Sequence, residues 1–154
     1  MMSTRPLTYK HKRVIDFLKS NNLVKNKTIL DVGGRDGLII DRLDGAFRKV
    51  ILDIDKLEIQ KSITKFKIVA DASFMPFCDN CFDVVIFSEV LEHLKNPEAV
   101  IKEIARIAKI VVLTTPNNSI LRKIIWRIRR KSVRFLCNLK ILIFSPKIFI
   151  AKKH

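Results

Sequence analysis

The sequence predicts an α/β protein in which a parallel β-sheet is covered by helices on both faces. Short apolar runs alternate along the chain with segments of helical spacing, and this order is typical of βαβ units. The runs consist mainly of Val, Ile and Leu without regular polar alternation, as expected for strands buried on both sides. We therefore expect three layers, α-β-α, with right-handed crossovers between the strands.

The first expected element is an amphipathic helix whose apolar side includes Val14 and Leu18. Pro97 suits the first turn of a later helix, where its missing N–H costs little. In chain order, the expected helices cover Val14–Leu23, Leu38–Leu43 and Pro97–Ala108, and the expected strands cover Thr28–Val32, Lys49–Ile54, Ile68–Ala70, Phe82–Phe87 and Ile110–Leu113.

The segment after Pro116 differs from the rest. Isoleucines at helical spacing, with Arg and Lys between them, predict a basic amphipathic helix around Trp126. Two short apolar runs, Ile141–Phe144 and Ile148–Ile150, indicate a β-hairpin. The uninterrupted apolar runs stay short of the roughly 18 residues that a membrane span requires.

Charge is distributed unevenly over the 154 residues, which suit one domain. The net charge of +15 divides into +6 for residues 1–27, −4 for 28–103 and +13 for 104–154. A basic flank attracts anionic partners, so residues 104–154 predict contact with RNA or with a membrane surface. The alternative is a solvated basic face without a partner.

The three cysteines indicate a reducing compartment and free thiols, because their number is low and odd. Cys78 and Cys81 form a lone C-x-x-C without the further ligands of a structural zinc site. The first 27 residues lack the pattern of a signal peptide. We therefore expect a cytoplasmic protein, peripheral at a membrane if the basic flank binds one.

Polar residues gather where the expected strands end, which is where open α/β sheets bind ligands. Asp31 opens a glycine-rich turn that reaches Gly37, and its spacing does not fit the G-x-G-x-x-G of nicotinamide sites. Asp53 ends the next strand, 22 residues after Asp31, where an acid can accept from ribose hydroxyls. Asp71 ends the third strand and could accept from an adenine amino group. Together these residues predict a nucleoside site.

Residues 28–117 resemble the class I S-adenosylmethionine (SAM)-dependent methyltransferases, in particular the small-molecule branch with the ubiquinone and menaquinone biosynthesis enzymes. The matching blocks are Ile29–Gly37, Leu52–Ile54, Ala70–Ala72, Met75–Phe77, Asp79–Asn80, Phe82–Val85, Ser88–His93 and Leu113–Asn117. The resemblance implies a Rossmann-like, mostly parallel seven-stranded sheet with an antiparallel C-terminal strand. It implies one domain over 1–154, with an N-terminal helix region (1–27), a cofactor-binding core (28–117) and a reduced C-terminal part (118–154).

The resemblance also assigns roles at matching positions. Asp31, Gly33 and Gly37, with Gly34 in the same turn, would hold the methionine part of SAM; Asp53 would bind the ribose, Ile54 would pack on adenine, Asp71 and Ala72 would frame the adenine edge, and Ser88 and Glu89 would lie near the sulfonium. Arg35 stands where the family commonly has glycine. Its side chain would point either to solvent or toward the SAM carboxylate.

The expected function is methyl transfer from SAM to an unidentified acceptor, either a small molecule or a lipid-like one. The alternatives are an RNA methyltransferase and a module that binds SAM or nucleic acid without turnover. Methyl transfer depends mainly on alignment and exclusion of water. A general base helps when the acceptor is a hydroxyl or amine, and Glu89 and His93 are the candidates.

Glu89, Glu92 and His93 form an E-x-x-E-H set that relatives acting on hydroxyl acceptors use to hold Mg²⁺. If this segment is helical, the three side chains share one face and could bind the ion. The alternative is a helix start whose Glu92 and His93 are solvated or hydrogen-bonded.

Overall fold

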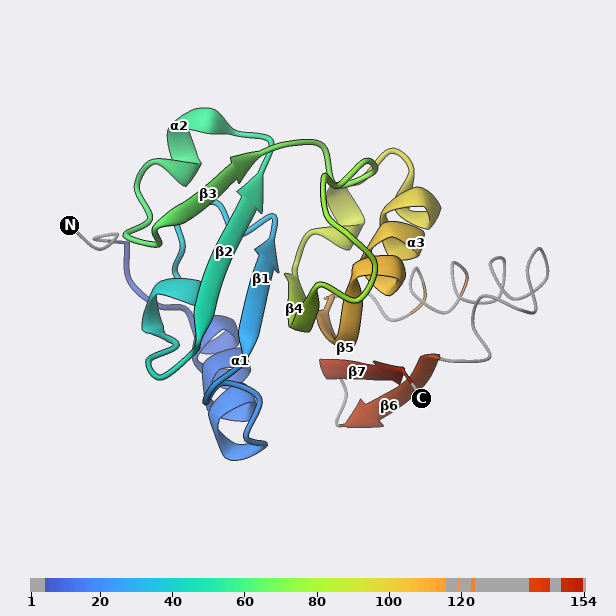
Figure 1. Cartoon of the computed structure of the whole chain (residues 1–154), viewed down its shortest axis with the longest axis horizontal. Coiled ribbons are helices and arrows are strands. Elements are labelled where there is room, and N and C mark those ends of the chain that lie inside the picture. Colours follow the sequence, from blue (N-terminus) through green and yellow to red (C-terminus); the bar gives the residue numbers. More distant parts are fainter. Residues whose placement is uncertain (1–4, 116–118, 120–122, 124–138, 145–147, 154) are drawn as a thin grey trace.

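A single sheet organises the chain. The structure, a computed structural model, describes residues 5–115, 119, 123, 139–144 and 148–153. The sheet holds seven strands in the order β3-β2-β1-β4-β5-β7-β6 (Figure 1). The strands are β1 (Thr28–Val32), β2 (Arg48–Asp53), β3 (Phe66–Val69), β4 (Phe82–Ser88), β5 (Ala108–Thr114), β6 (Leu139–Phe144) and β7 (Ile148–Lys153).

The strand directions follow the expected pattern. The strands β1 to β5 are mutually parallel, β7 runs antiparallel to β5, and β6 pairs antiparallel with β7. This confirms the five predicted core strands, the C-terminal hairpin and the antiparallel strand. The carboxyl ends of β1, β2 and β4 meet at one edge of the sheet, because Asp31 lies level with Ile51 and Ile86.

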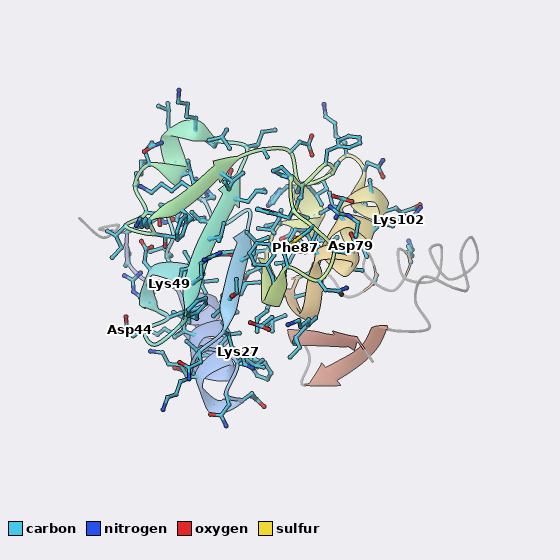
Figure 2. The ribbon with its side chains drawn as sticks, viewed as in Figure 1. Lys27, Asp44, Lys49, Asp79, Phe87 and Lys102 are labelled. Carbon is cyan, nitrogen blue, oxygen red and sulfur yellow. A yellow bond between two sulfur atoms is a disulfide. The ribbon has the colours of Figure 1, made fainter. Side chains whose placement is uncertain are left out.

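Two separate cores cover the two faces of the sheet and make it the central layer. Leu30 and Val32 of β1 pack in the core of α3 (Pro97–Ile107), whereas Ile29 packs in the core of α1 (Tyr9–Ser20). This alternation follows from the period of two along a strand. Phe87, fully buried in β4, lies within the α3 core (Figure 2). The expectation of a three-layer α-β-α fold is confirmed.

The helices begin where the sequence offers caps. Thr8 accepts a hydrogen bond from the backbone N–H of His11 at the start of α1, and Asn96 accepts from Ala99 at the start of α3. The first turn of α3 also contains Pro97. The predicted helices over 14–23 and 97–108 are therefore confirmed, although α1 begins and ends earlier than expected.

One helical prediction was wrong in extent, and the segment considered as a helix for the E-x-x-E-H set forms only a single turn. Over Leu38–Leu43 the structure forms only a 3₁₀ turn, η1 (Ile40–Arg42). The Asp41 carboxylate there turns inward and accepts hydrogen bonds from Ser62, Ile63 and Thr64, and Gly45 follows shortly. Over Val90–Leu94 the helical segment is again a single 3₁₀ turn, η2 (Leu91–His93). A short helix that the sequence did not indicate, α2 (Lys56–Ile59), is capped by Asp55.

The expectation of free thiols is wrong for Cys78 and Cys81, which form a disulfide in the loop before β4. Their Cα atoms lie 5.5 Å apart. The basic helix predicted around Trp126 falls outside the described residues, except that Ser119 and Lys123 are helical. Among the described residues, no helix is both long and apolar enough to cross a membrane.

Candidate active site

A cleft of about 890 Å³ opens at the carboxyl ends of β1, β2, β3 and β4. Of the residues predicted to bind the cofactor, the cleft brings together Asp31, Gly33, Gly34, Asp53, Ile54, Asp71, Ala72 and Ser88. Both candidate catalytic residues, Glu89 and His93, also line it. Gly37 and Glu92 are not among the lining residues. Residues far apart in the sequence thus converge on one site.

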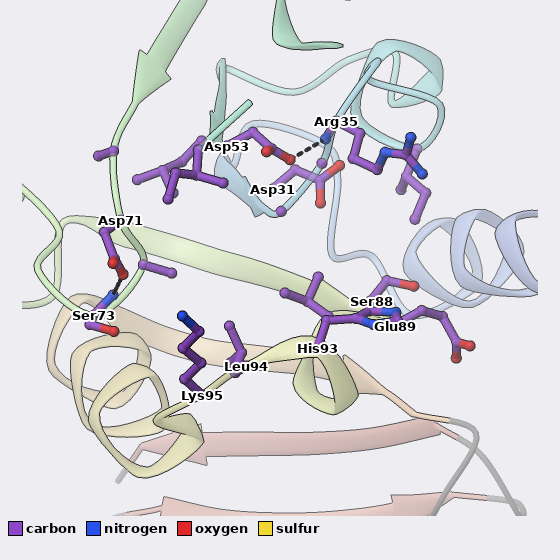
Figure 3. A pocket seen from close by; sticks show the side chains of 18 of the residues that line it. Asp31, Arg35, Asp53, Asp71, Ser73, Ser88, Glu89, His93, Leu94 and Lys95 are labelled. Carbon is purple, nitrogen blue, oxygen red and sulfur yellow. Dashed lines mark hydrogen bonds between the residues drawn. The ribbon is translucent and has the colours of Figure 1, made fainter. Parts of the chain in front are cut away.

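Asp53 is held rigidly at the end of β2 (Figure 3). Its Oδ2 accepts the backbone N–H of Arg35 at 2.8 Å, and its Oδ1 accepts that of Asp55 at 2.9 Å. The residue is 6% exposed, so water competes little for these bonds. Each carboxylate oxygen keeps a second lone pair. Asp53 can therefore accept two further hydrogen bonds from a ligand's hydroxyl groups without moving.

Two glycines of the turn are required for different steric reasons. A Cβ on Gly34 would lie 2.8 Å from Cγ of Asp31, so the turn packs directly on that carboxyl group. Gly37 has a φ of +77°, and a Cβ there would lie 2.4 Å from Oγ of Ser62. Gly34 thus allows the backbone to approach the cleft, while Gly37 supports the turn from behind.

Arg35 adopts the left-handed conformation, with a φ of +49°. This conformation costs a non-glycine residue roughly 1–2 kcal/mol. Its side chain is 58% exposed, and its guanidinium lies 3.6 Å from Oε2 of Glu58 in α2. Of the two orientations expected from the sequence, the structure has the solvent-facing one.

Buried acids crowd the methionine end of the predicted site. The buried aspartates at this end of the sheet are Asp31, Asp36, Asp41 and Asp53. Burial, together with repulsion from the other three carboxylates, raises the pKa of Asp31 to about 8, although a hydrogen bond from the backbone of Ile40 acts in the opposite direction. Asp36 is paired with Arg5 at 2.7 Å. A cation placed beside Asp31 would favour its ionised form, so the cleft suits a positively charged ligand.

The opposite end of the cleft offers apolar surface beside a carboxylate. Ile54 and Phe74 line it while remaining 72% and 83% exposed. Oδ1 of Asp71 accepts the backbone N–H of Ser73 at 2.7 Å, and hydrogen bonds from Ser73 lower the pKa of Asp71 (Figure 3). A flat heteroaromatic ring with an amino group would fit both features. Phe74 was missed by sequence reasoning, because nothing distinguishes it from a core phenylalanine.

Ser88 and Glu89 lie at the end of β4. The Ser88 hydroxyl hydrogen-bonds to the Thr114 hydroxyl at 2.8 Å, and the Glu89 backbone N–H donates to the carbonyl of Thr114 at 3.0 Å. Glu89 has a φ of +57°, and its Oε2 accepts from Nζ of Lys10 at 2.5 Å. The carboxylate is thereby engaged with α1.

The metal set proposed from E-x-x-E-H does not form. Because η2 is a single 3₁₀ turn, Glu89, Glu92 and His93 do not share a helix face. Oε2 of Glu92 is buried without a hydrogen-bond partner in the described part of the chain, and His93 is exposed. Within the described residues no three His, Cys, Asp or Glu side chains are grouped to hold an ion. The Mg²⁺ expectation is therefore not supported by the geometry.

Besides Phe74, sequence reasoning missed three basic side chains of the cleft, those of Arg5, His11 and Lys95. Nδ1 of His11 accepts the backbone N–H of Thr8 at 3.3 Å, so the neutral ring carries its proton on Nε2 and acts as a donor. Burial, and secondly the nearby Arg5, lower the pKa of His11. Lys95 extends into the cleft (Figure 3) and makes no salt bridge among the described residues.

Known proteins resemble this chain in sequence or in fold. The ubiquinone biosynthesis O-methyltransferase of Hydrogenovibrio crunogenus is 29% identical over 105 residues, which are 62% of this chain and 44% of that protein. This chain therefore spans less than half of that relative's length. The magnesium protoporphyrin IX methyltransferase of Synechocystis PCC 6803, solved with bound SAM, has a TM-score of 0.72 at 13% identity, covering 99% of this chain and 87% of that one.

A third protein, a putative RNA methyltransferase from Pyrococcus horikoshii, has a TM-score of 0.70 at 15% identity, covering 93% of this chain and 82% of that one. At these identities the solved structures establish the shared fold. Residues 30–110, just over half of the chain, match the family model described as a methyltransferase domain. The strand order and this match agree, and the chain belongs to the methyltransferase-domain family.

Proposed function

We propose that residues 1–154 form one SAM-dependent methyltransferase domain, with 28–117 as its cofactor-binding core. The observation that carries this proposal is the single cleft that collects Asp31, Asp53 and Asp71 from three strand ends. Their order suits the three parts of SAM. Asp31 would face the methionine ammonium, Asp53 the ribose hydroxyls, and Asp71 the adenine amino group.

The apolar contacts of the cleft support the same orientation. Ile54 and Phe74 would pack on adenine, with Ala72 at its edge, and this burial would offset their exposure in the free protein. The glycine turn at Gly33 and Gly34 would admit the methionine backbone. SAM supplies a methyl group activated by its sulfonium charge. The chain's own residues have to orient SAM and acceptor and to exclude water.

His93 is the better candidate for a general base. Glu89 is engaged by Lys10, whereas the exposed imidazole of His93 lines the cleft and has no salt bridge or side-chain hydrogen bond among the described residues. The Hydrogenovibrio relative is named as an O-methyltransferase. A hydroxyl acceptor loses a proton on methylation, and His93 would accept it. We therefore propose a small-molecule or lipid-like acceptor that presents a hydroxyl group.

Calorimetric titration with SAM and S-adenosylhomocysteine tests the cofactor site. We expect Asp53→Asn to weaken binding about 100-fold, because one ribose contact is lost and a buried donor is introduced. Asp44→Asn is the matched control, since Asp44 is exposed and lies outside the cleft. Equal affinities of the two variants would contradict the assignment.

A tritiated-SAM transfer assay against fractionated small-molecule and lipid extracts tests catalysis. We expect His93→Gln to lower the rate about 100-fold, within the range of general-base contributions, while the affinity for SAM is unchanged. Transfer to RNA rather than to these fractions would support the alternative acceptor. SAM binding without transfer to any fraction would support the non-catalytic module.

A further inference from the structure

The amino ends of the strands carry a surface that the methyltransferase site does not use. We define the amino-end surface as Lys27, Phe47, Arg48, Lys65 and Phe66. Arg48 begins β2, and Asp53, at the other end of this strand, lines the cleft. Five residue steps along a strand correspond to roughly 17 Å. The surface therefore lies at the opposite end of the strands from the cofactor site.

The members of the amino-end surface are in direct contact. The backbone N–H groups of Phe47 and Arg48 donate to the carbonyl of Lys27 at 2.9 and 3.3 Å. The guanidinium of Arg48 lies 5.8 Å from the ring centroid of Phe47 and 5.6 Å from that of Phe66. The ammonium of Lys65 lies 5.7 Å from the Phe66 ring. Cations and aromatic rings thus form one continuous patch.

The cations of this patch outnumber the carboxylates near them. Lys27, Arg48 and Lys65 make no salt bridge in the part of the chain that the structure describes. Two acids lie near this end of the strands. Asp79 pairs with Arg106 at 2.9 Å, and Asp83 pairs with Lys109 at 2.8 Å and lies close enough to Lys27 for that ammonium to contribute to its lowered pKa. Figure 2 shows Lys27 and the exposed Asp44 at this end of the molecule. Lys27, Arg48, Lys65 and Lys109 together outnumber Asp44 and Asp83 by two charges, so the surface is positive.

The row of basic residues continues across the sheet. Ile110, near the start of β5, pairs with Lys152 of β7, and Lys152 pairs with Lys140 of β6. The register therefore places further lysine positions at the same end of the sheet. Neighbouring strands lie about 4.8 Å apart, so the basic positions follow a line rather than a broad face.

We propose that the amino-end surface binds single-stranded nucleic acid, with phosphates on Lys27, Arg48 and Lys65 and a base stacked on Phe47. Linear cationic grooves with exposed aromatic rings are the features that bind such strands. Phe47 is 73% exposed and Phe66 43%, so both offer ring surface. An anionic membrane is less suitable, because the two partly exposed phenylalanines of this surface provide little apolar area to insert.

Fluorescence anisotropy with a labelled RNA of about 16 nucleotides, mixed in sequence, tests the proposal. The triple variant Lys27→Gln, Arg48→Gln, Lys65→Gln should lower the slope of log affinity against log salt by about 2, because each phosphate contact contributes about 0.7. The control triple Lys12→Gln, Lys19→Gln, Lys102→Gln removes the same charge from exposed helix positions and should leave the slope unchanged.

Phe47→Ala should weaken RNA binding about fivefold or more without changing the salt slope, since stacking is not ionic. Equal slopes in the two triples, no RNA binding by the wild type, or no effect of Phe47→Ala would each overturn the proposal. If the triple variant Lys27→Gln, Arg48→Gln, Lys65→Gln lost binding to phosphatidylserine vesicles but kept its RNA binding, the proposal would be overturned in favour of a membrane. The affinity for SAM, measured in parallel, should be the same in the wild type and the triple variant, so failure of the cofactor site is distinguished from failure of this surface.

Discussion

The carboxyl and amino ends of the parallel strands differ in the burial and in the sign of their charged side chains. At the carboxyl ends, aspartates are buried, and Gly33, Arg35, Gly37 and Glu89 have positive φ angles. At the amino ends, Lys27, Arg48 and Lys65 lie on the surface beside exposed phenylalanines. Left-handed residues occur at both ends, because Asn22, Asn26, Gly45 and Asn80 precede strands. The difference is that the carboxyl ends bury acids, whereas the amino ends expose basic side chains.

This difference follows from what each end must do. A chain that leaves a buried strand and turns back beside a ligand needs close backbone approach and left-handed residues. Burial of acids there is unfavourable unless backbone N–H groups or a cation compensate, as Arg35 and Asp55 do for Asp53. The basic side chains at the amino ends are not buried in this way, so they can contact solvent or a partner. We therefore expect substitutions at the carboxyl ends to have larger effects.

The largest difference is expected between two glycines. Gly37 and Gly45 both have positive φ, but a Cβ on Gly37 would meet Ser62 at 2.4 Å, whereas one on Gly45 meets nothing within 4 Å. We expect Gly37→Ala to lower the free energy of unfolding by about 3 kcal/mol, from left-handed strain plus overpacking, and Gly45→Ala by about 1 kcal/mol from strain alone. Urea denaturation measures both, and equal losses would refute the steric argument.

A pH dependence is expected from Asp31, whose pKa in the folded protein is raised to about 8 from 3.8. Below pH 3.8 both the folded and unfolded states are protonated here, and above pH 8 both are ionised. Between these values the folded state holds a proton that the unfolded state has released. Stability therefore falls as pH rises through this window, by up to about 1.4 kcal/mol per pH unit.

Asp31→Asn removes the titrating carboxyl group. The wild type should therefore lose stability relative to the variant as the pH rises from 5 to 7.5. Denaturant midpoints across this range provide the measurement. A difference that stays constant would show that Asp31 is ionised in the folded protein at neutral pH. SAM binding should release protons from the wild type, which titrations in two buffers of different ionisation enthalpy would detect.

A stabilising substitution is expected at Arg35. Replacement by glycine relieves a left-handed conformation worth about 1–2 kcal/mol, but increases the entropy of the unfolded chain by about 0.4–1 kcal/mol. The exposed contact to Glu58 contributes little. We expect Arg35→Gly to raise the free energy of unfolding by about 0.5–1 kcal/mol. Arg35→Ala keeps the strain and serves as the control; if it stabilises as much as glycine, strain is not the cause.

The smallest effect is expected at the amino end. Lys109 pairs with Asp83 at 2.8 Å, but its side chain is 59% exposed. Exposed pairs contribute about 0–1 kcal/mol, so Lys109→Ala should change stability by less than about 0.5 kcal/mol. Thermal unfolding at low and high salt measures this change in stability. A loss comparable to that of Gly37→Ala would contradict the expectation that substitutions at the amino ends have the smaller effects.

The strands and the polar residues at their ends could be predicted from the sequence because both depend on local patterns. A run such as Thr28–Val32, buried on both faces, has no polar alternation to obscure it, and an aspartate directly after such a run must emerge at the carboxyl edge. Asp53 is the last residue of β2 as predicted, and Asp31 lies one residue before the end of β1. Asp71 lies two residues after β3, which covers Phe66–Val69 rather than the predicted Ile68–Ala70. The C-terminal hairpin was recognised from its two apolar runs.

The tertiary structure decided what depends on contacts between distant segments. Arg5, which pairs with Asp36 of the glycine turn, and His11 of α1 reach the cleft from the N-terminal part of the chain, and Phe74 reaches it from the loop after β3. The inward hydrogen bonds of Asp41 reduced an expected helix to η1, and the short η2 separated Glu89, Glu92 and His93. The sequence by itself determined the strands, the acids at their ends and the family, since these are local. Which other residues line the cleft, and which residues form the amino-end surface, depends on packing, because strands that are neighbours in the sheet are distant in the chain.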